Sequence, residues 1–348
     1  MLYPTNRGRF VRLPKPTAHL VLAAALLATA CQPVEDFFKE KNQPPAPNLP
    51  ARIDFYREGL YPEGVSYDEP RKRFLVGSLR QGSIGAVLPD GTYFPLATDE
   101  ALISTVGLVV DKNRVLAAVS DPGSGVRTNP QTRGRLAALG IYNVVNGNRI
   151  AFVNLGALRP NLPHFANDVA VDPLGNAYVT DSFSPLIYRV DPQGNPSVLV
   201  EDSTFAVGPG QFGLNGIVYH PDGYLIVAFS RAGKLYKVSL TRPSTIQEIN
   251  LGLTLPSPDG LRLTKDGKFL VVVNNQRGTA PGRVLAFRGS DNWTSGTLVN
   301  EFTAEATFPT TATLVGKGVY VVYAKLNQVA AQPPVSVFTI QQAFPSLP

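Results

Sequence analysis

The chain has 348 residues, of which 44% are hydrophobic and 31 each are glycine and proline, so it can bury a sizeable core and make many turns. Its formal charge is +6, but four of the 32 basic residues precede position 16, and the remaining 28 nearly balance the 26 acidic residues. A near-neutral body lacks the basic surface that nucleic acids require, so we expect no nucleic-acid partner. The single cysteine excludes an internal disulfide and a thiolate zinc site.

Residues 1–30 predict a lipoprotein-type signal peptide. A basic segment precedes the apolar run 20–30, which is too short to span a bilayer permanently. Residues 27–31 resemble the lipobox of bacterial lipoproteins, which implies that Cys31 carries the lipid and begins the mature chain. The alternative is an ordinary signal peptide, a secreted protein and an incidental cysteine. Gln32 indicates delivery to the bacterial outer membrane, with the folded part facing the periplasm or the surface.

Residues 31–50 predict a flexible tether between the lipid and a folded domain. The run 43–47 is rich in proline, which favours a semi-extended conformation. We expect the folded domain to cover residues 51–348 and to be a monomer. The lipid would be its only contact with a membrane.

A pattern of about 48 residues recurs six times after the tether. Each copy begins with a distinctive residue and a small or polar one, followed by alternating apolar positions, as in 215–220. A turn containing proline or glycine comes next, then strand-like segments such as 225–227 and 235–238, and then a fourth, outer strand. Four antiparallel strands per unit, repeated six times, predict an all-β fold, the six-bladed β-propeller.

The segment 51–56 is strand-like and precedes the first full unit. We expect it to pair with the last blade and close the ring. An open ring would leave strand edges free to pair with other chains.

The first residue of each unit lies where the innermost strand of a blade begins, at one mouth of the central channel. These positions converge on one small volume, and four of them are polar: Glu63, Asn167, Asn215 and Asp259. Two carboxylates close together repel each other unless a cation lies between them, and carboxylate and amide oxygens suit a hard cation. The pattern therefore predicts one divalent metal on these four residues. Calcium is the first expectation, and zinc, manganese and magnesium stay open.

Ordinary turns are the alternative explanation of these four residues. Asn-Asp, Asn-Gly and Asp-Gly are common turn pairs, so any one of the four alone is more often a turn residue than a ligand. Their recurrence at the same position of separate repeats favours the metal site.

Four motifs carry a resemblance to a known family: 62–64 (Pro-Glu-Gly), 167–175, 214–216 (Leu-Asn-Gly) and 257–261. Together they resemble the gluconolactonase, regucalcin and senescence-marker-protein propellers, which are related more distantly to diisopropyl-fluorophosphatase and paraoxonase. The resemblance implies that Glu63, Asn215 and Asp259 bind the metal. Asn167 would be a fourth ligand or a substrate contact through water. It also implies hydrolysis of a lactone or related ester, in which the metal polarises the carbonyl and water attacks.

Further roles follow for residues beside the predicted ligands. Asp259 is the expected general base, and His164 is either a proton shuttle at the rim or a structural loop residue. We assign Asn167, Phe165 and Asp168 to substrate binding. Sugar lactonases of the family often carry an arginine where this chain has Phe165. We therefore expect a larger or more hydrophobic ester or lactone.

A second interpretation is a surface lipoprotein that binds a ligand or partner without catalysis, with calcium holding its blades together. Propellers host many functions, so the fold cannot decide between the two interpretations. The sequence has no nucleophile elbow, Walker loop or dinucleotide fingerprint, which argues against a serine-triad mechanism.

Overall fold

The computed structural model of the protein describes residues 1–2, 49–278 and 280–348. Its strands lie in the compact unit Ala46–Pro348. The predicted signal peptide, almost all of the tether and the lipid-bearing Cys31 fall on residues 3–48 and so lie outside the described residues. Within the described part of the chain, no helix is long and apolar enough to cross a membrane.

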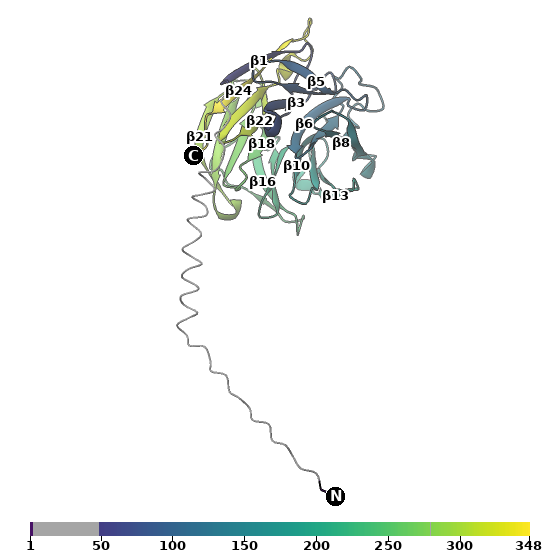
Figure 1. Ribbon diagram of the computed structural model, residues 1–348, viewed down its shortest axis with the longest axis vertical. Coiled ribbons are helices and arrows are strands. Elements are labelled where there is room, and N and C mark those ends of the chain that lie inside the picture. The colour runs from purple at the N-terminus through teal and green to yellow at the C-terminus, as the bar shows by residue number, and fades with distance from the viewer. Residues whose placement is uncertain (3–48, 279) are drawn as a thin grey trace. The chain divides into compact units, whose positions relative to one another are not determined.

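Six antiparallel sheets of four strands each form a propeller, as the repeats predict (Figure 1). Blade one contains β2 (Val65–Asp68), β3 (Arg73–Val76), β4 (Ile84–Val87) and β5 (Tyr93–Ala97). Blade two contains β6 (Ser104–Asp111), β7 (Arg114–Ser120), β8 (Ala137–Asn143) and β9 (Arg149–Asn154). Blade three contains β10 (Ala166–Val171), β11 (Ala177–Asp181), β12 (Leu186–Val190) and β13 (Pro196–Glu201).

Blades four to six have the same order of strands from the axis outward. Blade four contains β14 (Leu214–His220), β15 (Tyr224–Phe229), β16 (Lys234–Ser239) and β17 (Ile246–Glu248). Blade five contains β18 (Pro258–Leu263), β19 (Phe269–Asn274), β20 (Arg283–Gly289) and β21 (Gly296–Thr303). Blade six contains β22 (Pro309–Val315), β23 (Gly318–Tyr323), β24 (Val337–Phe344) and β1 (Arg52–Tyr56). Short 3-10 helices in the connections are η1 (Glu69–Arg71), η2 (Gly156–Leu158), η3 (Ser203–Phe205), η4 (Gln276–Gly278), η5 (Asp291–Trp293) and η6 (Leu326–Gln328).

The first strand among the described residues closes the ring. β1 pairs antiparallel with β24, with Ile53 opposite Ile340 and Phe55 opposite Phe338 (Figure 1). The predicted closure is therefore confirmed. The sixth blade is built from both ends of the propeller sequence, which protects its outer edge and joins the two ends of the domain.

The apolar core lies between neighbouring blades. Every residue of β15 is buried, because both faces of this strand are covered, whereas β21 alternates between half-buried and exposed residues at the rim. Ile226 of blade four packs in one cluster with Leu261 and Phe287 of blade five. Burying side chains of this size contributes about 1.5–3 kcal/mol each, so the contacts between blades hold the ring together.

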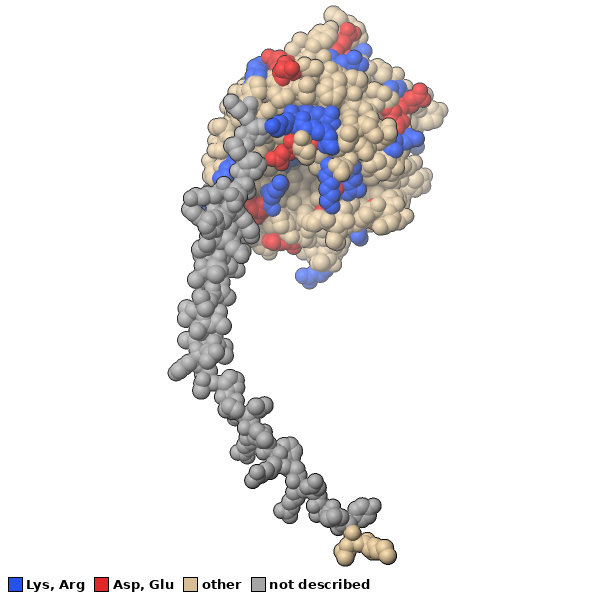
Figure 2. Space-filling view, in the orientation of Figure 1, with Lys and Arg blue, Asp and Glu red and all other residues tan. Residues whose placement is uncertain are grey.

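Charged side chains also tie blades to one another. Arg73 of blade one is paired with Asp68 over 3.0 Å and donates to the carbonyl oxygen of Val144, while Arg114 of blade two donates to the carbonyl oxygen of Gly175. On the face seen in Figure 2, Lys and Arg gather around a central hollow, and Asp and Glu lie beside them. This face therefore carries charges of both signs.

Candidate metal centre

A β-bulge at the start of the inner strands places the first residue of the repeat. Between β14 and β15 the register shifts between Leu214 and Ile217, which leaves Asn215 outside the regular ladder. The same shift occurs around Asn167 in blade three and around Asp259 in blade five. Because a bulge re-aims the side chain that it carries, these three residues leave the sheet and turn toward the axis.

The glycine that follows the first residue lets neighbouring inner strands approach closely. A Cβ atom at Gly216 would lie 2.4 Å from the carbonyl oxygen of Asp259, and one at Gly260 would lie 2.1 Å from Oγ1 of Thr311. Both contacts exclude any larger residue unless the backbone moves. The small second residue of the repeat therefore keeps the inner ring narrow.

A serine at the end of the second strand locks each bulge to the preceding blade. Ser120 donates to the carbonyl oxygen of Ala166 over 2.6 Å, Ser182 to that of Leu214 over 2.5 Å, and Ser230 to that of Pro258 over 2.5 Å. Each acceptor is the residue directly before a predicted ligand. These hydrogen bonds fix where the ligand-bearing backbone stands relative to the neighbouring blade.

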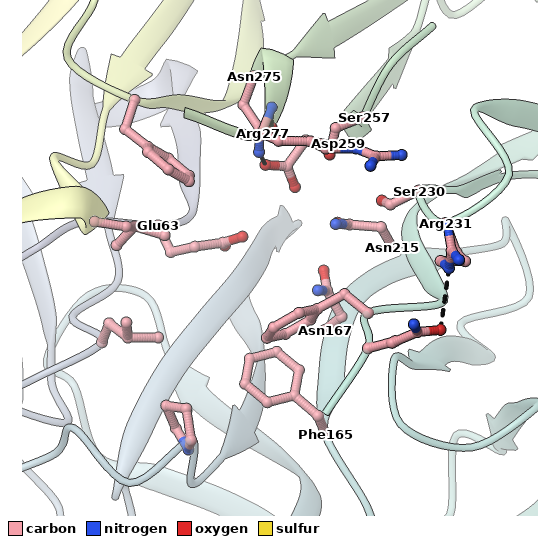
Figure 3. A pocket seen from close by; sticks show the side chains of 16 residues that line it. Glu63, Phe165, Asn167, Asn215, Ser230, Arg231, Ser257, Asp259, Asn275 and Arg277 are labelled. Carbon is pink, nitrogen blue, oxygen red and sulfur yellow. Dashed lines mark hydrogen bonds between the residues drawn. The ribbon is translucent and has the colours of Figure 1, made fainter. Parts of the chain in front are cut away.

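The four predicted ligands line one cavity of about 540 Å³. Their polar ends point toward one another in Figure 3, with Glu63 from blade one facing Asn167, Asn215 and Asp259 from blades three, four and five. All are buried, with exposed fractions of 7% for Glu63, 4% for Asn167, 8% for Asn215 and 4% for Asp259. Phe165 also lines the cavity.

Hydrogen bonds orient three of these side chains. Nδ2 of Asn167 donates to Oγ of Ser182 over 3.0 Å, so its Oδ1 is left to face the cavity. Nδ2 of Asn275 donates to Oδ2 of Asp259 over 2.6 Å. The Asn215 side chain also hydrogen-bonds the Asp259 carboxylate. Rotating the Asn215 amide by 180° would present its Oδ1, in place of its Nδ2, to a cation in the cavity.

The two carboxylates are held in a setting that disfavours their charge. Burial and the nearby charges of Asp259 and Asp168 raise the pKa of Glu63 well above its usual value, against the influence of Arg262. Burial raises the pKa of Asp259 to about 7, although hydrogen bonds from Asn275 and Asn215 lower it. No described residue donates a hydrogen bond to the Glu63 carboxylate. A cation between the two carboxylates would remove this penalty.

The donor set fits a hard divalent cation. It consists of two carboxylates and two amides, which are the oxygen donors that calcium, magnesium and manganese prefer. Among the described residues, no three His, Cys, Asp or Glu side chains are grouped to hold a metal. An ion in this cavity would therefore depend on the amide oxygens of Asn167 and Asn215 as well as on the carboxylates.

Asp168 does not line the cavity, so its position gives no support to a role in substrate binding. It follows Asn167 in the strand and points the other way, where Oδ2 lies 3.6 Å from Nη1 of Arg262. Arg262 also donates to the carbonyl oxygens of Val65 over 3.1 Å and Leu108 over 3.3 Å. Burial raises the pKa of Asp168, and Arg262 opposes that rise. This buried pair links blade five to blades one, two and three.

His164 is also outside the cavity lining. Its Nδ1 lies 2.7 Å from Oδ2 of Asp181, and its Nε2 lies 2.9 Å from the carbonyl oxygen of Arg159. Burial lowers the pKa of His164, but the hydrogen bond and charge of Asp181 outweigh it, so the pKa is raised. With both ring nitrogens engaged, this position favours the structural alternative over a proton shuttle.

An aromatic wall beside the site was not predicted. The rings of Phe165, Phe183 and Phe212 contact one another, with centroids 5.2–5.3 Å apart. Oδ1 of Asp181 accepts hydrogen bonds from the backbone N–H groups of Phe165 and Phe183, at 2.8 and 3.0 Å, and so holds two of the three loops. The sequence offers little signal for this wall, because its residues lie in connections of unequal length.

Similar solved structures show the same fold, whereas no protein-family model and no curated protein matches the chain. The allergen Mala s 1 of Malassezia sympodialis is 21% identical, with a TM-score of 0.67 over 84% of this chain and 96% of its own. A gluconolactonase from Xanthomonas campestris is 15% identical, with a TM-score of 0.58 over 84% and 89%. A luciferin-regenerating enzyme is 15% identical, with a TM-score of 0.55 over 85% and 98%. At identities of 15–21%, these structures share the propeller fold with this chain.

Proposed function

We propose that the protein is a metal-dependent hydrolase of a lactone or related ester. The observation that carries this proposal is the convergence of Glu63, Asn167, Asn215 and Asp259 in one buried cavity with an aromatic wall. The gluconolactonase among the similar solved structures supports this class of reaction.

The four residues would hold one divalent metal, with calcium as the first choice. When bound, the metal acts as a Lewis acid toward a carbonyl oxygen and lowers the pKa of a coordinated water. Asn275 fixes Oδ2 of Asp259 through its 2.6 Å hydrogen bond, and Asn215 also hydrogen-bonds this carboxylate. With the Asn215 amide turned by 180°, Asp259 and Asn215 would both offer oxygen to the cation.

The apolar part of the cavity would hold the acyl group and limit access of water. Phe165 is 3% exposed and lines the same cavity as Asn167, so a substrate against its ring also lies near the predicted ligands. This arrangement favours a hydrophobic ester or lactone over a sugar lactone.

The proposal is tested by measuring metal content and hydrolysis of a panel of lactones, aryl esters and phosphotriesters. We expect bound divalent metal and turnover that chelation abolishes. Asp259→Asn should lower kcat/KM by about 100-fold or more, because it removes a ligand and a base. Asp222→Asn, an exposed turn residue, is the matched control and should leave turnover unchanged. Bound metal without turnover on the whole panel would favour the ligand-binding lipoprotein instead.

We also propose that Cys31 anchors the protein to the bacterial outer membrane through a lipid. The support is the sequence pattern around residues 20–32. In cells fed a labelled fatty acid, the wild-type chain should carry label and sediment with membranes, and Cys31→Ser should do neither. Label on the Cys31→Ser chain would contradict the anchor.

A further inference from the structure

The cavity has an apolar side and a polar side. Blades one, two and six and the connections leading into blades three and four contribute the apolar residues, and blades four and five contribute polar and basic ones. The apolar residues are Leu79, Pro122, Phe165, Phe212, Phe308 and Leu326, and the polar ones on blades four and five are Ser230, Arg231, Ser257, Asn275 and Arg277. A substrate that fills this cavity would meet a different chemistry at each side.

Arg231 and Arg277 are fixed in the lining by one nitrogen each. Nε of Arg231 donates to Oε1 of Gln211 over 3.0 Å, and Nε of Arg277 donates to the carbonyl oxygen of Pro256 over 3.0 Å. Figure 3 shows Arg231 across the cavity from Glu63, with its bond to Gln211 dashed. These bonds orient each guanidinium, and among the described residues none accepts a hydrogen bond from its two Nη groups.

The charges of these two arginines are not neutralised by the protein. Neither forms an ion pair with any Asp or Glu among the described residues. Arg159, by contrast, is paired with Glu201 over 2.6 Å, and Arg127 donates Nη1 to three backbone carbonyl oxygens. Two arginines without a carboxylate partner among the described residues therefore line the same cavity.

The backbone beneath this region is constrained. Arg277 and Phe308 have φ angles of 57° and 61°, in the left-handed region that residues with side chains rarely adopt. A Cβ atom at Gly278 would lie 2.4 Å from the Phe308 ring, so these segments pack tightly against each other. The turn thus fixes where the Arg277 side chain leaves the backbone.

We propose that the substrate carries an anionic group, a carboxylate or a phosphate, which Arg231 and Arg277 bind while an apolar body lies against Phe165 and Phe212. Planar guanidinium groups with free Nη donors suit both anions, because each offers paired oxygen acceptors. This inference rests on the proposed function in taking the ligand to be an ester or lactone. Recognition of the anion can be measured without any turnover.

The test compares binding of three probes to the purified protein by isothermal titration calorimetry. They are phenylbutanoate, its neutral amide and a phenylpropyl phosphate monoester. The variants are Arg231→Gln with Arg277→Gln, and Arg242→Gln as the control, since Arg242 is an exposed arginine at the opposite end of blade four. Each titration is repeated after chelation, because a carboxylate can also bind a metal directly.

We expect at least one anion to bind about tenfold more tightly than the amide in the wild type and in the control, with or without metal. In the double variant this preference should fall to about twofold or less, while the amide binds as before. The probe that shows the preference identifies the anion. Equal binding of all probes, or a preference that survives in the double variant and disappears on chelation, would overturn the inference. If the wild type prefers the anion but hydrolyses none of the tested substrates, the proposed hydrolase activity is refuted and the anion-binding inference stands.

Discussion

Asp259 is the residue whose protonation decides most directly whether the cavity holds a cation. Burial raises its pKa to about 7, and Asn275 and Asn215 oppose that rise through hydrogen bonds. Below pH 7 the carboxyl group is mostly protonated in the metal-free protein, so a cation must displace a proton in order to bind. Above pH 7 the carboxylate is already ionised and this competition disappears.

Calcium affinity should therefore rise with pH. Between pH 6 and pH 8 we expect a gain of at least about tenfold, because displacing the Asp259 proton alone gives that factor and the raised pKa of Glu63 adds to it. Calorimetric titration of the metal-free protein at both values checks this, with proton release measured in two buffers. An affinity that stays constant over this interval would show that Asp259 is ionised without metal or does not bind it.

The sequence predicted the positions of some site residues better than those of others. Glu63, Asn167, Asn215 and Asp259 could be brought together because they share a repeat position, and the structure does place them around one cavity. Asp168 and His164 were assigned by proximity in sequence. Neither lines the cavity. Asp168 follows Asn167 in β10 and its side chain lies toward Arg262 instead. His164 lies in the connection before β10, where Asp181 and the carbonyl oxygen of Arg159 hold its ring.

At the scale of the strands, the bulge in each inner strand acts together with the serine at the end of the second strand of the preceding blade. The bulge turns Asp259 inward, and Ser230 holds the carbonyl oxygen of Pro258 next to it. The repeated strands and turns were predictable because they follow apolar alternation and turn chemistry. Bulges were not, because the two residues that oppose a single partner residue differ from one blade to the next.

Replacing Ser230 with alanine should weaken the site without unfolding the blade. It removes a 2.5 Å hydrogen bond and leaves the Pro258 carbonyl oxygen without its partner, which costs about 1–3 kcal/mol. Calcium affinity should fall several-fold as the strand that carries Asp259 loses its lock. Ser197→Ala on the exposed outer strand β13 is the control. If both variants bind calcium as the wild type does, the lock is unimportant for the site.

At the scale of the whole molecule, the ring depends on contacts that cross the channel. Arg262 reaches from blade five to carbonyl oxygens of blades one and two and to Asp168 of blade three. Its charge also lowers the pKa of Glu63 and of Asp168, both of which burial raises. Arg262 therefore compensates part of the negative charge that the buried carboxylates bring into the channel.

Arg262→Met should destabilise the propeller strongly. Removing one partner of a buried ion pair typically costs about 3–5 kcal/mol, because the other charge stays buried and unpaired. The double variant Arg262→Met with Asp168→Asn should recover part of that loss. Urea unfolding of the three proteins provides the comparison. A single variant as stable as the wild type would show that the pair does not hold the ring.

The central claim is that one divalent ion binds between Glu63 and Asp259, and the most direct measurement is the metal content of the protein. Elemental analysis of the purified chain, after dialysis against trace metals, should find about one divalent ion per chain in the wild type. Glu63→Gln with Asp259→Asn, which keeps the shape of both side chains and removes their charge, should contain none. A wild-type chain without metal, or a double variant that retains it, would contradict the account.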